Sequence, residues 1–396
     1  MRRRVLWITI CVCLVAVFTL GCGETTPTTE PIGETWETAN PVTMIYACSA
    51  GTTHGSFVGL TPYFEKLDEV SGGKFKTRVF PGGVLASSKT MLPITKDALC
   101  DSSHVITTYF SSELPATLII GDCAGSLDNA VAATGATCEM FALYGDLFKD
   151  ECMENNVYIF GAYATRPYVL HAKDKPVTTL ADMEGLKIRS GGPLWTRMGD
   201  YLGAIPVSIP ASESYEGLAR GTIDAAWSLA DYQRSYSYWD ITPYVTYGAW
   251  GCYNASAAVT FRRDWFDEQP IIAKKTLLEN FAMVFSKVTI DAYIAAEDKT
   301  MKQAIEKGTQ TFQPAPDLEK AIGDFHIADR QNLVAIAMER GVDKALAENI
   351  IDTYLNVLFP KWVKLAEEEI GLDSDKFTEV LNREVYYPLM QKMGLK

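Results

Sequence analysis

The segment Pro176–Trp227 constrains the fold most, because signals for strands and helices alternate along it. The apolar stretch around Ile188 is typical of a strand, and a proline shortly after it favours the first turn of a helix. A glycine ends that helix, a second strand and a second helix follow, and another glycine stands where the second helix should end. The residues that mark these boundaries are Gly191, Gly192, Pro193, Gly203, Ile205–Ile209, Ser212 and Gly221.

The order strand, helix, strand, helix, strand predicts a parallel sheet within an α/β fold. Open sheets of this kind bind ligands at the carboxyl ends of their strands, and Arg189 stands at such an end. A guanidinium is a planar, permanently charged fork that binds a carboxylate through two hydrogen bonds, which the ammonium of Lys187 cannot do. We therefore expect Arg189 to bind an anion. The alternative is a surface arginine at a strand end.

Several short motifs follow one another along the same segment. They are Pro176-Val177, Asp182, Gly185-Leu186-Lys187-Ile188-Arg189, Leu202-Gly203-Ala204-Ile205-Pro206-Val207 and Gly221-Thr222-Ile223-Asp224. In this order they resemble the ligand-binding stretch of the TRAP (tripartite ATP-independent periplasmic) transporter solute-binding proteins, a dicarboxylate-binding-receptor-like family. The resemblance extends over about residues 41–365. One departure is Val84, which follows Pro81-Gly82-Gly83 where the family usually has glutamine.

The resemblance implies an α/β, two-lobed periplasmic-binding-protein-like fold with a ligand cleft between the lobes and a long domain-spanning helix. Its expected parts are lobe I over 41–160, with a return of the chain at about 254–270, lobe II over 161–253, a bridging helix over 271–307, and a C-terminal helical region over 308–396 that packs on the lobes. The role of the last thirty residues stays open.

The stretch between Pro270 and Gly308 supports the bridging helix independently, because it contains no internal proline or glycine. At a rise of ~1.5 Å per residue, a helix over Pro270–Lys307 approaches 55 Å, which is longer than a single small domain. We expect this helix to bend or pivot rather than break, since no glycine or proline supplies a flexible point.

The resemblance implies an extracytoplasmic solute receptor. Such a receptor captures a small organic acid, whose identity the sequence leaves open, through an arginine–carboxylate clamp and delivers it to a TRAP-type membrane permease without any cofactor. One alternative is a lipid-anchored sensor that presents the same cleft to a signalling receptor. A weaker alternative is a periplasmic hydrolase, but the chain contains no G-x-S-x-G or H-E-x-x-H motif and only 4 histidines.

Five further residues are candidate ligand contacts, each with a structural alternative. Arg166 lies upstream of Arg189 at about the interval where the family often carries a second arginine, and Ser228 aligns where many relatives have asparagine. Trp227 falls at a strand end facing the expected cleft, or else belongs to the core. His54 and Tyr109 occupy loops that would border the cleft from lobe I. A tyrosine-rich cluster is interpreted as half-buried packing, and its members are Tyr232, Tyr236, Tyr238 and Trp239.

The N-terminus predicts export. Three arginines precede the apolar run Val5–Leu20, which is short for a spanning helix but typical of a signal peptide, here residues 1–21. Thr19–Cys22 resembles a lipobox, with threonine where leucine is preferred, so we expect a lipid on Cys22 and a tether over 22–40. The alternatives are ordinary cleavage near Gly21 or an uncleaved anchor. The protein is therefore expected outside the cytoplasm, bound to the membrane through its lipid.

Composition excludes some partners. The formal net charge is −13, and removal of the three signal arginines makes it more negative, which argues against nucleic-acid binding. No cysteine or histidine spacing matches a metal site. We expect one helix over Ala136–Asn155, which would hold Cys138 and Cys152 roughly 21 Å apart and prevent their pairing. Oligomeric state stays open, as does disulfide pairing among Cys48, Cys100, Cys123, Cys138, Cys152 and Cys252.

Overall fold

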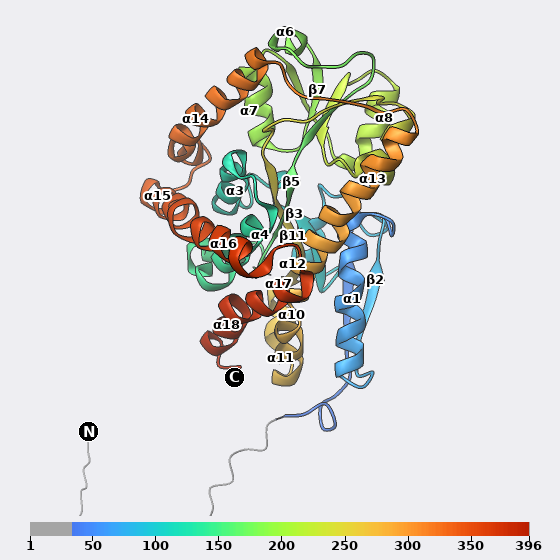
Figure 1. The fold of residues 1–396 in the computed structure, drawn as a ribbon. Coiled ribbons are helices and arrows are strands. Elements are labelled where there is room, and N and C mark those ends of the chain that lie inside the picture. The colour runs from blue at the N-terminus through green and yellow to red at the C-terminus, as the bar shows by residue number, and fades with distance from the viewer. Residues whose placement is uncertain (1–33, 396) are drawn as a thin grey trace, which may run out of the picture.

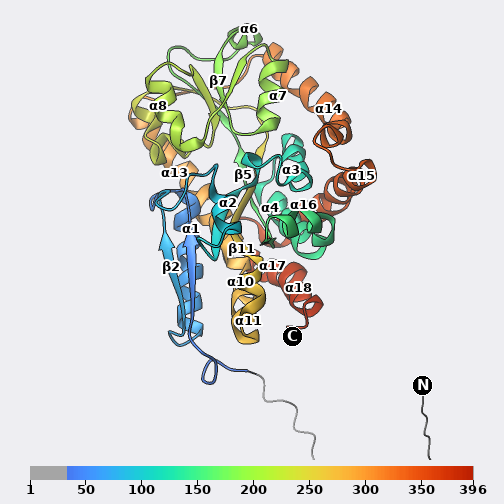
Figure 2. The same ribbon diagram turned by 180° about the vertical axis from the view of Figure 1, so that it is seen from behind.

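The computed structural model describes residues 34–395, so the signal segment and Cys22 lie outside the described residues. Two lobes, each built on one sheet, are stacked along the long axis of the molecule, and helices from the C-terminal part of the chain wrap around them (Figures 1 and 2). The two-lobed α/β prediction is confirmed. Within the described part, no helix has the length and apolar character needed to cross a bilayer.

The sheet of lobe I has six strands in the order β2-β1-β3-β11-β4, with β5 also paired to β11. β1 runs parallel to β2 and β3, whereas β11 runs antiparallel to β3, β4 and β5. β5 and β11 lead toward lobe II, so they connect the two lobes (Figure 1). The strands are β1 (Val42–Ala47), β2 (Phe75–Phe80), β3 (Ser102–Ile106), β4 (Val157–Ile159), β5 (Tyr163–Pro167) and β11 (Cys252–Arg262).

The sheet of lobe II has the order β12-β10-β6-β9-β7-β8. β7 runs parallel to both β8 and β9, which confirms the parallel arrangement predicted for this segment. β12 lies within the region expected to be only helical, and it adds an edge strand to this sheet. The strands are β6 (Val169–Ala172), β7 (Lys187–Ser190), β8 (Ile205–Ser208), β9 (Ala225–Ser228), β10 (Tyr244–Thr246) and β12 (Gln310–Phe312).

The helices α7 (Pro193–Tyr201) and α8 (Ser214–Ala219) connect the parallel strands of lobe II. Gly203 and Gly221 follow these helices with φ of +81° and +69°, a left-handed conformation that glycine adopts without a Cβ penalty. The prediction of Ser212 as an N-cap is wrong. Ser212 lies inside a 3₁₀ turn, Ala211–Glu213, which precedes α8 and makes Glu213 its N-cap.

The helix expected over Ala136–Asn155 is two helices, α4 (Ala130–Leu143) and α5 (Lys149–Glu154), separated by a 3₁₀ turn. The chain turns there because Phe148 folds back on Phe141, with ring centroids 5.0 Å apart. Cys138 lies on α4 and Cys152 on α5, and both are free thiols. The other helices of lobe I are α1 (Gly55–Val70), α2 (Met91–Lys96) and α3 (Pro115–Asp122).

The bridging helix is not continuous over Pro270–Lys307. α11 (Ile271–Glu279) ends at Asn280, whose side-chain amide donates to the carbonyl of Thr276, and Phe281 is fully buried among aromatic rings of lobe I. The Asn280 side chain competes for a backbone carbonyl, and Phe281 is held among the aromatic rings of lobe I. Together these two effects interrupt the helix although the segment contains no glycine or proline. The part that runs on into lobe II consists of α12 (Ala282–Ser286), a π-helical segment (Lys287–Ile294) and α13 (Ala295–Glu306).

The C-terminal helices cover lobe I, with α14 also contacting α6 (Leu180–Met183) and α7 of lobe II (Figures 1 and 2). Trp362 anchors the C-terminal helices to lobe I, because its ring is buried and its Nε1 donates a hydrogen bond to Glu139 on α4 at 2.7 Å. Residues 367–395 belong to the packed body of lobe I, because α17 packs on α12, α18 packs on α4, and side chains such as Phe377 and Tyr386 are fully buried. The helices are α14 (Pro316–Glu339), α15 (Lys344–Asp352), α16 (Phe359–Leu365), α17 (Ser374–Leu381) and α18 (Tyr387–Lys392).

Two glycines on α1 let the bridging segment approach closely. A Cβ built on Gly59 would lie 2.7 Å from Val288 Cα, and one on Gly55 would lie 2.9 Å from the carbonyl oxygen of Ala292. Both neighbours are backbone atoms of the π-helical segment, so they cannot move aside as a flexible side chain would. Glycine at these positions fixes α1 against the segment that leads into lobe II.

We predict that Gly59→Ala lowers the free energy of unfolding by about 1–3 kcal/mol, because the added methyl group overpacks a contact between backbones. Gly323→Ala is the matched control. Gly323 lies inside helix α14 with open space around the position of a Cβ, so alanine should stabilise by about 0.4–1 kcal/mol. Urea titration of both variants measures the difference. Equal effects of the two substitutions would contradict the close approach described here.

Candidate functional site

A small cavity lies between the lobes, at the carboxyl ends of β3 and β7. Its volume is about 50 Å³, where a single water needs roughly 10–15 Å³ by the same measure, so only a small ligand fits without movement of the walls. Both lobes and both connecting strands contribute to the lining. The lining includes histidines, tyrosines and one arginine, namely His54, His104, Tyr109, Tyr163, Tyr168, Arg189, Tyr232, Tyr236, Tyr253 and Tyr293.

Arg189 on β7 occupies the floor of this cavity on the side of lobe II, and it is 1% exposed. Its Nε donates to the carbonyl oxygen of Ile209 at 3.2 Å, and its Nη1 donates to that of Trp227 at 2.9 Å. These carbonyls stand at the ends of β8 and β9, the two strands that flank β7. The guanidinium has five N–H groups, so the hydrogens that remain on Nη1 and Nη2 are available for a ligand.

The charge of Arg189 has no acidic partner among the described residues. Its third contact is Tyr109 of lobe I, whose Oη lies 3.5 Å from Nη2. Burial alone lowers the pKa of the guanidinium, but the surrounding tyrosines, Tyr109 and Tyr168 first, raise it, so the net pKa is raised and the group stays charged. A buried charge without a counterion is costly, and an anion bound in the cavity would relieve that cost.

Tyrosine rings form most of the remaining wall. Tyr168 stacks on Tyr253 with ring centroids 5.7 Å apart, and Tyr163 stacks on Tyr293 at 5.5 Å. A third pair belongs to α9 (Tyr232–Ser235) and the residue after it, where Tyr232 and Tyr236 meet edge to face at 4.5 Å. The wall therefore combines flat apolar surfaces with phenolic hydroxyl groups.

Two histidines line the cavity from lobe I, and both are neutral at pH 7. His54 caps α1 by accepting the backbone N–H of Ser56, and burial lowers its pKa to about 4. His104 lies on β3, and burial lowers its pKa to about 3, with a smaller contribution from His54. His54 thus has the capping role that the sequence left as its alternative, and it also contributes to the cavity.

The side chains of Trp227 and Ser228, expected to contact the ligand, lie outside this cavity. Both are on β9 and are fully buried, and neither side chain lines the cavity. The ring of Trp227 packs in the core, with its centroid 5.7 Å from that of Trp250, so only its backbone carbonyl faces Arg189. β9 is a central strand with both faces covered, so these side chains pack inside lobe II, and the ligand contacts expected for them stay predictions.

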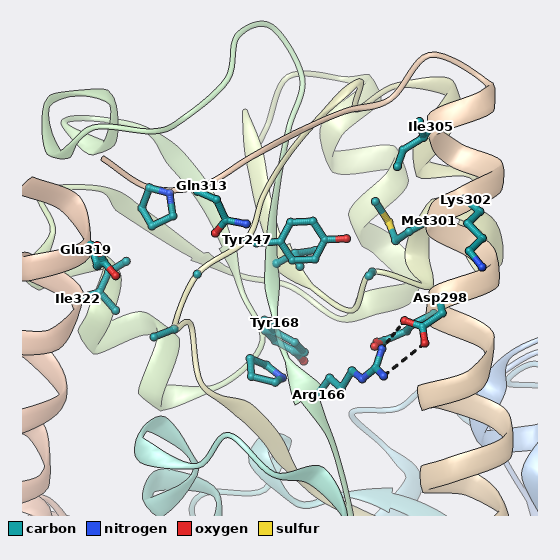
Figure 3. Close-up of a pocket in the computed structure, with 17 residues that line it drawn as sticks. Arg166, Tyr168, Tyr247, Asp298, Met301, Lys302, Ile305, Gln313, Glu319 and Ile322 are labelled. Atoms are coloured by element: carbon teal, nitrogen blue, oxygen red, sulfur yellow. Dashed lines mark hydrogen bonds and ion pairs between the residues drawn. The ribbon is translucent and has the colours of Figure 1, made fainter. Parts of the chain in front are cut away.

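Arg166 lies in a second, larger cavity of about 970 Å³ beside the connecting strand β5 (Figure 3). Its Nη1 forms an ion pair with Asp298 on α13 at 2.6 Å. The buried Glu297 beside it has a pKa raised to about 8, mainly by burial. Asp298 neutralises Arg166 here, whereas Arg189 has no acidic partner among the described residues, so we favour the smaller cavity at Arg189 for an anion. The ligand contact expected for Arg166 stays a prediction.

The structure therefore brings Arg189, Tyr109 and His54 together, as expected, and adds residues that sequence reasoning missed. Tyr232 and Tyr236, interpreted as packing residues, line the cavity. Their position just after the carboxyl end of β9 was the available signal, since ligands bind at that edge. His104 gave no local signal, because no recognisable motif surrounds it in the short strand β3. Within the described part of the chain, no cluster of histidine, cysteine or acidic side chains could hold a metal ion.

Comparison with known families assigns the chain. Residues 47–324 match the family described as "Bacterial extracellular solute-binding protein, family 7". The protein belongs to this family. Membership places the chain among bacterial extracellular solute-binding proteins, which confirms the resemblance and favours a solute receptor over the hydrolase alternative.

Curated relatives match over shorter stretches. A monocarboxylate 2-oxoacid-binding periplasmic protein of Nostoc is 25% identical over 182 residues, which is 45% of this chain and 48% of the relative. A solute-binding protein of Albidiferax ferrireducens is 20% identical over 54% of this chain and 59% of its own length. The chain thus spans about half the length of the curated relatives it matches.

Solved structures share the fold over most of the chain. A TRAP solute-binding protein of Rhodoferax ferrireducens in complex with benzoate is 21% identical to this chain, with a TM-score of 0.71. The match covers 82% of this chain and 99% of the other chain. A TRAP periplasmic solute-binding protein of Bordetella bronchiseptica with bound mandelate is 22% identical, with a TM-score of 0.68, and the shares covered are 81% and 99%.

We predict that His54, His104 and His171 do not titrate between pH 8 and pH 5, because burial lowers their pKa values to about 4, about 3 and about 3. The unfolded chain takes up these protons near pH 6.5. The three histidines therefore lower the free energy of unfolding as the pH falls from about 6.5 toward their folded pKa values.

Imidazole C–H signals in NMR spectra, assigned with single His→Asn variants, measure these titrations. The urea-unfolded protein is the control, in which all signals should move with a midpoint near 6.5. A midpoint near 6.5 for any of the three in the folded protein would contradict the burial described here.

Proposed function

We propose that this protein captures a small organic acid through Arg189 and delivers it to a TRAP-type permease. The observation that carries the proposal is the buried guanidinium, held by two backbone carbonyls, with no acidic partner among the described residues. A carboxylate in the cavity would accept from the remaining N–H groups as a charge-assisted pair. The acids named for relatives and structural neighbours, among them 2-oxoacids, benzoate and mandelate, support this ligand class.

Contacts between the lobes support a receptor that closes around its ligand. Arg197 on α7 of lobe II donates to Asp122 on α3 of lobe I at 2.9 Å, and it also pairs with Asp329 on α14 at 2.7 Å. Tyr109 of lobe I approaches Arg189 of lobe II in the cavity itself. These contacts belong to the closed arrangement, and a ligand that contacts both lobes would favour it.

Lipidation of Cys22 is part of the same proposal. Because residues 1–33 lie outside the described residues, the anchor rests on the sequence pattern alone. A lipidated cysteine followed by a polar tether would keep the receptor near the permease.

We predict that Arg189→Ala weakens binding of the acid by about 2–5 kcal/mol, because a charge-assisted pair is lost from a site closed to water. Arg189→Lys should be nearly as damaging, since an ammonium lacks the fork that meets a carboxylate through two hydrogen bonds. Isothermal titration calorimetry with an acid found by a thermal-shift screen measures both. Arg220→Ala is the control, because Arg220 is exposed and pairs only with Glu216 one turn away. An affinity within threefold of the parent for either Arg189 variant would refute the clamp.

We also predict that the radius of gyration falls when the acid binds, as small-angle scattering would show. Arg197→Ala should weaken binding by about tenfold without touching the cavity, because the closed state loses an ion pair between the lobes, worth roughly 1–2 kcal/mol at this partly buried site. The same Arg220→Ala variant should leave both measurements unchanged. An unchanged profile at saturating ligand would argue for a preformed rigid pocket.

A further inference from the structure

Charge is scarce in the cavity between the lobes. Among the described residues that line it, Arg189 is the one side chain with a formal charge at pH 7, because His54 and His104 are neutral and the lining contains no lysine, aspartate or glutamate. A bound monoanion leaves such a site neutral. A dianion adds a second negative charge with no partner in a region closed to water, and a neutral ligand leaves the guanidinium unpaired.

His104 supplies a second polar feature. The residue is 2% exposed, and its Nε2 has no hydrogen-bond partner among the described residues. Its Nδ1 lies 3.6 Å from Cys48 Sγ, and the same sulfur accepts the backbone N–H of Ala50 at 3.3 Å. Burial raises the pKa of the Cys48 thiol to about 12, so the sulfur keeps its hydrogen.

This arrangement accommodates one tautomer of His104 in particular. The Cys48 sulfur accepts from Ala50 while its own hydrogen can be donated to Nδ1, and the ring hydrogen of His104 then lies on Nε2. Nε2 is then a neutral donor in the cavity wall without an acceptor. An unmade hydrogen bond at a buried donor is costly, so a ligand oxygen that accepts from Nε2 would gain affinity.

We infer that the ligand is a small monocarboxylate whose uncharged body carries an oxygen acceptor, a hydroxyl or oxo group, for His104. This inference rests on the proposed function and names its ligand class. Arg189 of lobe II binds the carboxylate, His104 of lobe I binds the oxygen, and the tyrosine rings between them contact the carbon skeleton. Recognition of the two ends by different lobes couples the chemistry of the ligand to closure.

Two matched sets of compounds test the charge. The first is lactate, its amide lactamide, and methylmalonate, in which a carboxylate replaces the hydroxyl group. The second is mandelate, mandelamide and phenylmalonate, which repeats the comparison on an aromatic skeleton. We expect the hydroxy acid of at least one set to bind, with its amide and its dianion weaker by at least about thirtyfold in calorimetry, as for a buried charge left without its partner.

A variant of His104 tests the oxygen acceptor. Propionate and phenylacetate lack the hydroxyl group but keep the carboxylate and skeleton. We expect His104→Phe to weaken the hydroxy acid by about five- to tenfold and to leave the acid without hydroxyl unchanged, since only one hydrogen bond is lost. His104→Gln, which keeps an N–H donor, should recover part of the loss. His326→Gln is the control, because His326 lies on α14 outside the cavity.

The outcomes separate the two proposals. Failure of these compounds and of every acid in the thermal-shift screen to bind would refute the proposed function, and this inference with it. Binding of methylmalonate or phenylmalonate as tightly as the hydroxy acid would refute the inference and leave the solute receptor standing. Equal losses for hydroxy and deoxy acids in His104→Phe would show that His104 acts only through the packing of the cavity.

Discussion

The placement of one guanidinium determines how the rest of the site is built. Arg189 reaches the interior because β7 lies between β8 and β9, whose terminal carbonyls at Ile209 and Trp227 accept two of its N–H groups. Backbone carbonyls are fixed by the sheet itself, so they orient the fork without an acidic side chain that would neutralise it. The parallel βαβ order of lobe II thereby produces a charged but unpaired group at the face that meets lobe I. A site of this kind is prepared for an anion, because the protein supplies orientation and leaves neutralisation to the ligand.

Closure depends on how the connections between the lobes are packed. They are the antiparallel strands β5 and β11, the helical run from α12 to α13, and the return of the chain from β12 through α14. Gly55 and Gly59 hold α1 against the π-helical part of that run, so its lobe I end is fixed by contact between backbones. The break at Asn280 separates α11 from the run. The helix that enters lobe II therefore begins within the aromatic core of lobe I.

Sequence reasoning reached the architecture because the signals were local and periodic. The strands and helices between Lys187 and Ser228 were marked by glycine, proline and alternating apolar residues, and Arg189 stood at a strand end where ligands bind. The same reasoning failed where tertiary packing decides. Nothing in the local sequence shows that the Trp227 ring packs in the core while its backbone carbonyl faces the site. The ion pair of Arg166 with Asp298 could not be predicted locally either, because it joins residues far apart in the chain. The break at Asn280 is of the same kind, since it depends on where Phe281 is buried.

Backbone groups and side chains have different roles in the cavity. The groups that hold Arg189 are carbonyls, so substitution of the side chains at Ile209 or Trp227 would preserve the clamp as long as the sheet is preserved. The walls, by contrast, are side chains: His104 and a set of tyrosines contributed by loops, by helical segments and by the connecting strands. Such positions change the shape and hydrogen bonding of the cavity without disturbing the sheet. Under the proposed function, a general ability to bind carboxylates would reside in the backbone of lobe II. Discrimination among carboxylates would reside in the side chains of the wall, many of which belong to lobe I and would meet the ligand only when the lobes are closed.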